Sequence, residues 1–534
     1  MKRLIITTII LLIAAVGVTV VYFKNLNPQS QRTSQIMRTI PGNAALIFEF
    51  NNDDGFYDIF KDNELFTAVM GKPCVDELDT LRKQLLLNPA LEHFFTGQNI
   101  FISLHPLKSN DIGLLLTTSA AKGFKATIID QLIKQQNTGL LITAENIEGK
   151  KGYIIYSNIL KKRFYLINIE DDIFAGSFSR DLIVQSIKRD PKKDEADFVL
   201  LPDQQNSNSL AELYVNYSQL NPLFDQLFTN KNTTIFKSFR LFPGLSALSL
   251  NFKSSALMFS GLTDIQKNAP EAYLNLFINQ QPVVSQLNNI FPSTTAYSIT
   301  FGLSNPLKFS VDLSQWQAKA KMQQEKDSLF KKVKAETGIN LIKEFSQALS
   351  NEFAVVTTRY QEKLAIISVK DGSNLRPVIN NISTKITDNT GQFNYNKLPF
   401  FLLGDAFNVF KRPYFMIIDN YLILANSTNE LASYYDSYTN RKFLSKISEY
   451  NQFDNLLGER SNITWFINFK NSQPELKRDL RPGFFNAFEN NDPGWKNYYG
   501  ASFQLSAAGK RFYTNFCMSV NLPDTTNAEQ PLIK

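Results

Sequence analysis

Few side chains in this sequence belong to the types that catalyse reactions or bind metals. The chain contains two histidines, His93 and His105, which cannot form a histidine-rich metal centre and lack the H-x-x-x-H spacing of one helix face. His93 follows Glu92 at the end of a predicted helix, and His105 ends a predicted strand just before Pro106. We therefore expect both rings at the surface or at element boundaries, with neither acting as a general base.

One serine and one lysine have the spacing of a nucleophile and its base. Ser328 and Lys331 fit the S-x-x-K pattern, which places a lysine one helical turn from a serine. The companion motifs of that enzyme class are missing, as are G-x-S-x-G, the phosphate-binding loop, G-x-G-x-x-G and C-x-x-C. The pair lies on a strongly charged predicted helix, so we expect a solvated helix face. The sequence predicts no catalytic, cofactor-binding or metal-binding residue, and no cofactor.

The acidic clusters have the composition of turns. Residues 51–55 (NNDDG) offer oxygen ligands, but Phe50 stands where a calcium loop of this spacing needs its first acid. Residues 170–172 (EDD) and 419–420 (DN) lie between apolar runs, where tight hairpins select Asp and Asn because these residues tolerate positive φ. We expect turns at all three places and no calcium site.

Aromatic residues are the one surplus, with 44 phenylalanines in the chain. Residues 399–403 (PFFLL) and 482–485 (PGFF) are apolar segments beside turn residues. They have the composition to line a groove for a peptide, lipid or glycan chain. We favour packing into a core, because strands and loops of such folds normally turn phenylalanine inward.

The first element that positions the chain is its N-terminal apolar run. Residues 4–23 (LIITTIILLIAAVGVTVVYF) contain no charge, and a helix of this length spans the roughly 30 Å hydrocarbon core of a bilayer. Lys2 and Arg3 favour a cytoplasmic N-terminus, which places the bulk of the chain in the periplasm. A cleaved signal peptide with a small-x-small site at residues 15–17 is the alternative. We favour the uncleaved anchor, because the apolar run continues past that site.

The net charge of +7 does not indicate a nucleic-acid partner. Residues 1–38 hold five basic residues and no acidic one, so the charges of the remaining chain nearly balance. The excess positive charge lies beside the predicted anchor, where it favours anionic lipid headgroups. The two cysteines, Cys74 and Cys517, are too few for a disulfide framework. We expect two buried thiols, with a single bridge between them as the alternative.

After the anchor, strand and helix patterns alternate, and their order occurs twice with an offset near 250 residues. The matched segments are 40–50 with 291–301, 164–175 with 414–425, and 213–217 with 465–469. We therefore predict an α+β fold of two related units with antiparallel sheets and packed helices, after one transmembrane helix. The predicted parts are a transmembrane signal anchor (1–24), a polar spacer (25–39), the first unit (40–265), a helical connection (266–290), the second unit (291–521) and a disordered tail (522–534).

Several helices are expected between the strands. Residues 75–95 have helical spacing, with three leucines on one stripe. A connecting helix is expected around residues 271–289. Residues 314–337 show a long, strongly charged helical pattern with little apolar face, so we expect a helix that projects or covers a seam.

The anchor, the polar spacer, a proline-led strand at 45–50 (ALIFEF) and serial hairpins together resemble uncharacterised single-pass, signal-anchored envelope proteins of Gram-negative bacteria. The resemblance covers the architecture of the chain and includes no catalytic motif, so it implies no site residue. We expect a non-enzymatic, membrane-anchored extracytoplasmic binding or scaffold protein of the bacterial envelope. Residues 4–23 would lie in the inner membrane, and the partner would be an envelope protein, a lipid or a glycan. A carrier of a lipid or hydrophobic ligand is the first alternative, and an envelope hydrolase using carboxylates or a Ser/Lys pair is the second.

Overall fold

The computed structural model describes residues 35–61, 72–108, 111–124, 127–134, 140–170, 172–189, 209–229, 242, 244–253, 255–265, 272–490 and 495–521. The predicted membrane helix (4–23) and tail (522–534) lie outside these ranges, so both stay predictions. Within these ranges, no helix combines the length and the hydropathy that a membrane span requires. Ile36 and Met37, at the end of the predicted spacer, are buried in an apolar cluster against the sheet, so the fold begins before residue 40.

The long strands join in one antiparallel sheet. In the first half of the chain they are β1 (Leu46–Asn51), β2 (Asn99–Pro106), β3 (Ile112–Ser119), β4 (Leu140–Ile147), β5 (Lys150–Ser157), β6 (Lys162–Glu170), β7 (Ile173–Ser177), β8 (Ala211–Asn216), β9 (Gly244–Lys253) and β10 (Ala256–Ile265). In the second half they are β12 (Thr295–Gly302), β13 (Leu349–Thr358), β14 (Lys363–Val369), β15 (Ser383–Lys385), β16 (Thr390–Phe393), β17 (Tyr414–Ile418), β18 (Tyr421–Ala425), β20 (Ile463–Asn468), β21 (Tyr498–Ala508) and β22 (Arg511–Val520). A separate two-stranded sheet consists of β11 (Val283–Val284) and β19 (Arg460–Ser461).

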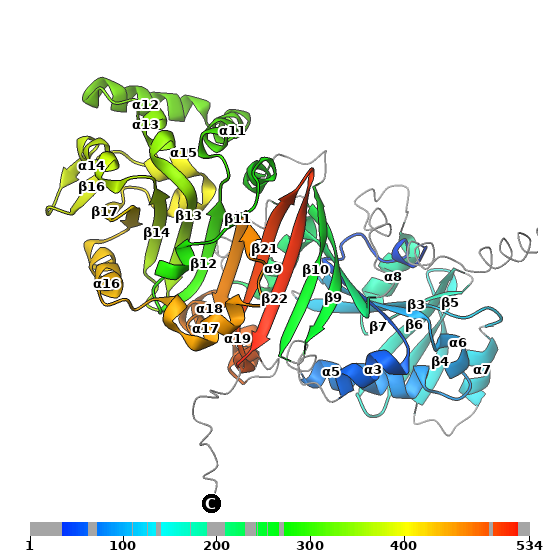
Figure 1. Cartoon of the computed structure of the whole chain (residues 1–534). Helices are drawn as coiled ribbons and strands as arrows, with labels where there is room; N and C mark the ends of the chain where they lie inside the picture. Colours follow the sequence, from blue (N-terminus) through cyan, green and yellow to red (C-terminus); the bar gives the residue numbers. More distant parts are fainter. Residues whose placement is uncertain are drawn as a thin grey trace, which may run out of the picture.

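The strands follow the same spatial order in both halves. Hydrogen-bonded neighbours run β4-β5-β6-β7-β3-β2-β1-β8-β9-β10 in the first half. In the second half they run β15-β16-β17-β18-β14-β13-β12-β20-β21-β22. The last strands of the two halves, β10 and β22, pair with each other and so join one sheet of 20 strands. This pair stands at the centre of Figure 1, and the two halves extend to either side of it. The predicted α+β class with antiparallel pairing is confirmed.

Short turns set the register of the hairpins. Glu148 and Gly149 join β4 to β5, and both have positive φ (48° and 83°), as a two-residue hairpin loop of this kind requires. Asp419 and Asn420 form the two-residue loop that joins β17 to β18, with φ of 48° at Asp419. The hairpin turn predicted at 419–420 is therefore confirmed.

Helices cover both faces of the sheet in each half (Figure 1). In the first half, one face carries α3 (Asp54–Lys61), α5 (Lys72–Leu81), the π-helical turn η1 (Arg82–Leu86), α6 (Glu92–Phe95) and α7 (Thr127–Lys134), and the other carries α8 (Arg180–Lys188). In the second half, one face carries α11 (Pro306–Lys319), α12 (Gln323–Thr337), α13 (Leu341–Ala348), α14 (Gly372–Asn381), α15 (Leu398–Leu403) and η7 (Asp405–Val409). The other face carries α16 (Thr428–Thr439), η8 (Leu444–Lys446) and α17 (Ser448–Asp454). The end of α9 (Tyr217–Leu227) meets α18 (Gln473–Asp479) and α19 (Pro482–Glu489), so these three helices link the halves. A short 3-10 segment, η9 (Trp495–Asn497), precedes β21.

Two predicted helices are interrupted by proline. The single helix expected at 75–95 is divided into α5, η1 and α6, and the turn before α6 contains Pro89. The connecting helix expected around 271–289 is replaced by two 3-10 segments, η5 (Tyr273–Asn279) and η6 (Leu287–Ile290). Pro282 lies between these segments and has no N–H to donate to a continuous helix.

The charged helical pattern at 314–337 also differs from its prediction. It is divided between α11 and α12 near Lys321, whose φ of 62° is left-handed and ends a helix. Leu313 of α11 and Val333 of α12 are buried in the main core. The two helices therefore pack on the second half of the sheet and do not project from it.

Candidate functional site

The two histidines lie in different environments. His93 is exposed on α6, as expected. His105 is completely buried in β2, with its Nδ1 2.8 Å from the Asn43 side chain and its Nε2 2.8 Å from the Ser103 hydroxyl. Burial, aided by nearby Arg189, lowers the pKa of His105 to about 3, so this ring is neutral and structural. His105 therefore lies at the end of β2, as the boundary expectation has it, but it is buried there and not at the surface.

The other polar candidates lie where the sequence predicted. Ser328 and Lys331 are both exposed on α12, as expected for a solvated helix face. In the segment 51–55, the Asp53 carboxylate accepts the N–H of Phe56 at 2.8 Å and so begins α3, which confirms a turn. Among the residues that the structure describes, no three His, Cys, Asp or Glu side chains gather as metal ligands.

Cys517 and the aromatic segments belong to the core. Cys517 is a buried free thiol in β22, and the side chain of Cys74 lies outside the described part of the chain. Residues 399–403 lie within α15, where Phe401 is buried, and Phe485 of the 482–485 segment is buried at the start of α19. The interpretation of both aromatic segments as core is therefore confirmed.

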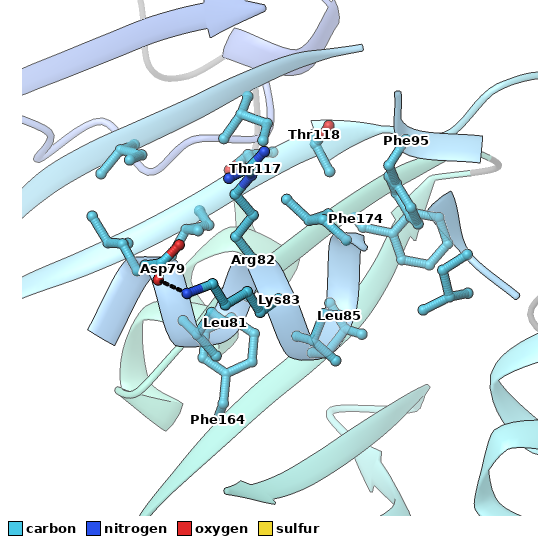
Figure 2. Close-up of a pocket in the computed structure, with 18 of the residues that line it drawn as sticks. Asp79, Leu81, Arg82, Lys83, Leu85, Phe95, Thr117, Thr118, Phe164 and Phe174 are labelled. Carbon is cyan, nitrogen blue, oxygen red and sulfur yellow. Dashed lines mark ion pairs between the residues drawn. The ribbon is translucent and has the colours of Figure 1, made fainter. Parts of the chain in front are cut away.

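A cavity of about 670 Å³ lies between the helices and the sheet of the first half. Helices α3, α5 and η1 supply one side of its lining, and strands β2 to β7 supply most of the other (Figure 2). Most of the lining is apolar, including Leu81 and Leu85 from the helices, Leu116 from β3, and Phe164 and Phe174 from β6 and β7. Its volume falls within the range of roughly 300–1,000 Å³ that is typical of small-molecule pockets.

The corresponding face of the second half is filled. Phe345, Phe353 and Phe407 are buried there, and a void lined by α13, α14, α15 and β14 measures only about 10 Å³. The sequence gives the cause: residues 394–413, between β16 and β17, supply α15 and η7, whereas β5 and β6 are joined by the turn 158–161. The first half therefore lacks the segment that fills the second.

Arg82 brings a cation into the wall of the cavity. In Figure 2 its side chain extends from η1 toward β3. Its Nε is buried without a hydrogen-bond partner, and no carboxylate of the described chain forms an ion pair with it. The carbonyl of Arg82 accepts the N–H of Leu87 at 2.9 Å, the i→i+5 bond of a π-helix, and such turns are frequent at functional sites.

Tyr57 of α3 holds one face of the Arg82 guanidinium. The Cζ of Arg82 lies 3.3 Å from the centroid of the Tyr57 ring, which is a close cation–π contact. The Tyr57 hydroxyl donates to Oδ1 of the buried Asn52 at 2.8 Å. Burial raises the pKa of Tyr57 to about 12, although Arg82 opposes the shift, so the phenol is neutral at pH 7. The tyrosine therefore positions the cation without neutralising it.

Acidic side chains stand at the rim of the cavity. Asp54 and Asp58 of α3 and Asp76 of α5 belong to its lining and are exposed. Asp79 also lines the cavity, and its carboxylate pairs with Lys83 at 2.6 Å. The polar groups thus form an acidic outer rim, a single inner arginine and two threonines of β3, Thr117 and Thr118, and most of the remaining interior is apolar.

Sequence reasoning found the leucine stripe of this wall but not the cavity. Leu78, Leu81 and Leu85 were predicted to share one helix face, and all three line the cavity. Arg82 is four residues after Leu78 and three before Leu85, which places it on the same stripe. A basic residue within an apolar stripe was the one available signal for a site here.

A serine–lysine contact exists away from the cavity. The Nζ of Lys326, a buried lysine of α12, donates to the hydroxyl of Ser314 in α11. Burial lowers the pKa of Lys326. Neither residue belongs to the lining of the cavity, so we assign the contact to the packing of α12 on α11.

A second buried ionisable group lies in α18, near the contact between the halves. Glu475 is completely buried, and neither carboxylate oxygen has a hydrogen-bond partner among the described residues. Burial raises the pKa of Glu475, Asp479 adds to the rise, and Arg478 and Lys363 oppose it. Because this group keeps its proton more strongly in the folded chain, it makes stability depend on pH.

We predict that Glu475→Gln reduces the pH dependence of the unfolding free energy. Between the ordinary pKa of 4.5 and the raised folded-state pKa, the native chain holds a proton that the unfolded chain has released. The contribution of Glu475 to stability is therefore complete below pH 4.5 and is lost as the pH rises through the folded-state pKa. Urea unfolding of the full chain at steps from about pH 4 to about pH 8 measures this slope. Glu489→Gln, an exposed site on α19, is the control, and equal slopes for Glu475→Gln and the unaltered chain would contradict the prediction.

Comparison of this chain with protein families, with curated proteins and with solved structures found no match.

Proposed function

We propose that this chain is a membrane-anchored binding protein whose first half holds an apolar ligand of the lipid class in the cavity between η1 and the sheet. The observation that carries the proposal is the cavity of about 670 Å³ with its largely apolar lining. An apolar space of this size weakens a fold unless something fills it, because the side chains that line it lose packing contacts. A ligand with an apolar body restores those contacts and is stabilised by leaving water.

The contrast between the halves supports this assignment. Within the proposal, residues 40–265 and 291–521 are related units that arose by tandem duplication. The identical strand order and the repeated hairpins support that relation. The second unit has a filled core, so the open interior of the first is not a general consequence of the strand order. We propose that the first unit binds the ligand and that the second unit supports the first structurally.

The proposed setting is the periplasmic side of the bacterial inner membrane, with residues 4–23 as an uncleaved anchor. The uncharged apolar run and the basic residues before it support this placement. An anchor beside a lipid-binding unit keeps the cavity close to a source of apolar molecules. The proposed activity is binding and not catalysis, and the location of the Ser314–Lys326 contact outside the cavity supports that choice.

Two measurements on the purified full-length protein test the proposal. Solvent extraction followed by mass spectrometry is expected to recover an apolar, lipid-class molecule in roughly equimolar amount. After delipidation, a fluorescent fatty-acyl probe is expected to bind saturably in nanodiscs that contain the protein, above the partition into nanodiscs without it. A chain that yields no such molecule and shows no saturable probe binding would refute the proposed function.

A further inference from the structure

We propose that the ligand is a long-chain carboxylate, that is, a fatty acid whose headgroup binds to Arg82. This inference rests on the proposed function and names the class of ligand. It follows from a cation that lines an apolar cavity with a buried N–H donor left unused. A buried donor of this kind costs stability until an acceptor reaches it, and a charged donor gains most from a charged acceptor.

The orientation of Arg82 selects a planar acceptor. The ring of Tyr57 occupies one face of the guanidinium, at 3.3 Å from Cζ, and the buried Nε–H at the edge of the group has no hydrogen-bond partner. The edge that contains Nε–H presents two roughly parallel donors, which match the two oxygens of a carboxylate. A fatty alcohol offers one weak acceptor to this edge and no charge. The geometry therefore favours the acid over the alcohol.

The rim limits the charge of the headgroup. Asp54, Asp58 and Asp76 stand exposed at the cavity, and the lysine beside them, Lys83, is already paired with Asp79. A phosphate monoester carries more negative charge than a carboxylate, so these carboxylates repel it more strongly. One inner arginine balances a single negative charge. The acidic rim and Arg82 together favour a monoanion over a phosphate monoester.

The apolar part of the remaining lining fits an acyl chain. Ile142, Ile155, Phe164 and Phe174 come from four strands, and Ile129 comes from α7. These side chains offer neither charge nor hydrogen-bond donors, so they suit methylene groups and not a second polar headgroup. The ligand that satisfies both parts of the cavity has one acidic end and one long apolar end.

Competition of three probes with a fluorescent fatty acid tests the headgroup assignment on the full-length protein in nanodiscs. Palmitate, hexadecanol and hexadecyl phosphate share one alkyl length and differ in the headgroup. Palmitate is expected to bind about 30-fold more tightly than hexadecanol, because a charge-assisted hydrogen bond in a buried site contributes an affinity difference of this size. Hexadecyl phosphate is expected to bind more weakly than palmitate. Equal binding of palmitate and hexadecanol overturns this inference and leaves the proposed function intact, whereas no binding by any of the three overturns both.

Substitution of Arg82 assigns the preference to this residue. Arg82→Gln is expected to weaken palmitate about 30-fold and to leave hexadecanol nearly unchanged, so the headgroup preference disappears. Arg82→Lys is expected to retain part of the preference, because it keeps the charge and loses the fork of donors. Arg163→Gln, on an exposed position of β6, is the matched control and is expected to bind all three probes as the unaltered chain does. If Arg82→Gln binds palmitate as tightly as the unaltered chain does and keeps the full preference over hexadecanol, Arg82 does not bind the headgroup. If the glutamine variant does not fold, the same result for Arg82→Lys overturns the role of Arg82.

Discussion

Leu116→Trp is expected to weaken binding of the apolar ligand at least about tenfold while the fold stays as stable as before. Leu116 lies in β3, lines the cavity and is only partly buried because the cavity is beside it. An indole at this position takes up space that the ligand needs, and it adds packing contacts to the surrounding leucines and phenylalanines. The unfolding free energy is therefore expected to stay within about 1 kcal/mol of the original or to rise.

The matched control for this change lies in the second half. Ile367 of β14 occupies the filled face and borders the void of about 10 Å³. Ile367→Trp forces an indole into a packed core, so it is expected to cost about 1–3 kcal/mol of unfolding free energy and to leave ligand binding unchanged. Probe titration and urea unfolding of both variants give the two readouts. Unaltered ligand binding by Leu116→Trp would show that the ligand does not occupy this cavity.

The strands and hairpins were predictable because their signals are local. An apolar run such as residues 45–50 followed by Asn and Asp identifies a strand and its turn without knowledge of the rest of the chain. Asp419 and Asn420 are enough to place the hairpin at 414–425, because Asp and Asn between two apolar runs are typical of tight turns, and Asp419 has the positive φ that such turns favour. Helix ends were less predictable, since Pro89 and Pro282 interrupt patterns that otherwise continue.

The cavity was not predictable, because periodicity shows which face of an element is apolar but not what covers that face. The stripe of Leu78, Leu81 and Leu85 has the same pattern whether a partner fills the space or not. The decisive difference is the presence of residues 394–413 in one half and their absence from the other. The longer connection in the second half can be recognised by comparing loop lengths between the two halves, although the pattern of no single helix or strand reveals it.

The pairing of the two halves through β10 and β22 could not be predicted from the sequence pattern either. The strands β10 and β22 each end their half of the chain, and nothing in their alternation specifies the neighbour on the open side. Their pairing leaves β4 and β15 as the two outer strands of the sheet. Because the last strands of the two halves pair with each other, both halves contribute side chains to one continuous core.

Gly261→Ala is expected to lower the unfolding free energy by about 3 kcal/mol or more. Gly261 lies in β10, opposite Leu248 of β9 on one side and Thr514 of β22 on the other. A Cβ at this position would stand 2.0 Å from the backbone carbonyl oxygen of Ala247, and a main-chain atom within a paired strand cannot rotate aside. The new methyl group therefore has to push β9 away from β10, next to the strand pair that connects the halves.

The control for this prediction is the same substitution where space is free. Gly483 lies in the first turn of α19, and a Cβ there would meet no atom within 4 Å. Gly483→Ala is expected to raise the unfolding free energy by about 0.5 kcal/mol, because alanine restricts the unfolded chain and favours helix. Urea unfolding of both variants of the full chain measures the opposite signs. A loss below about 1 kcal/mol for Gly261→Ala would mean that β9 and β10 can separate at little cost, and then the central strands could not hold the two halves in one rigid sheet.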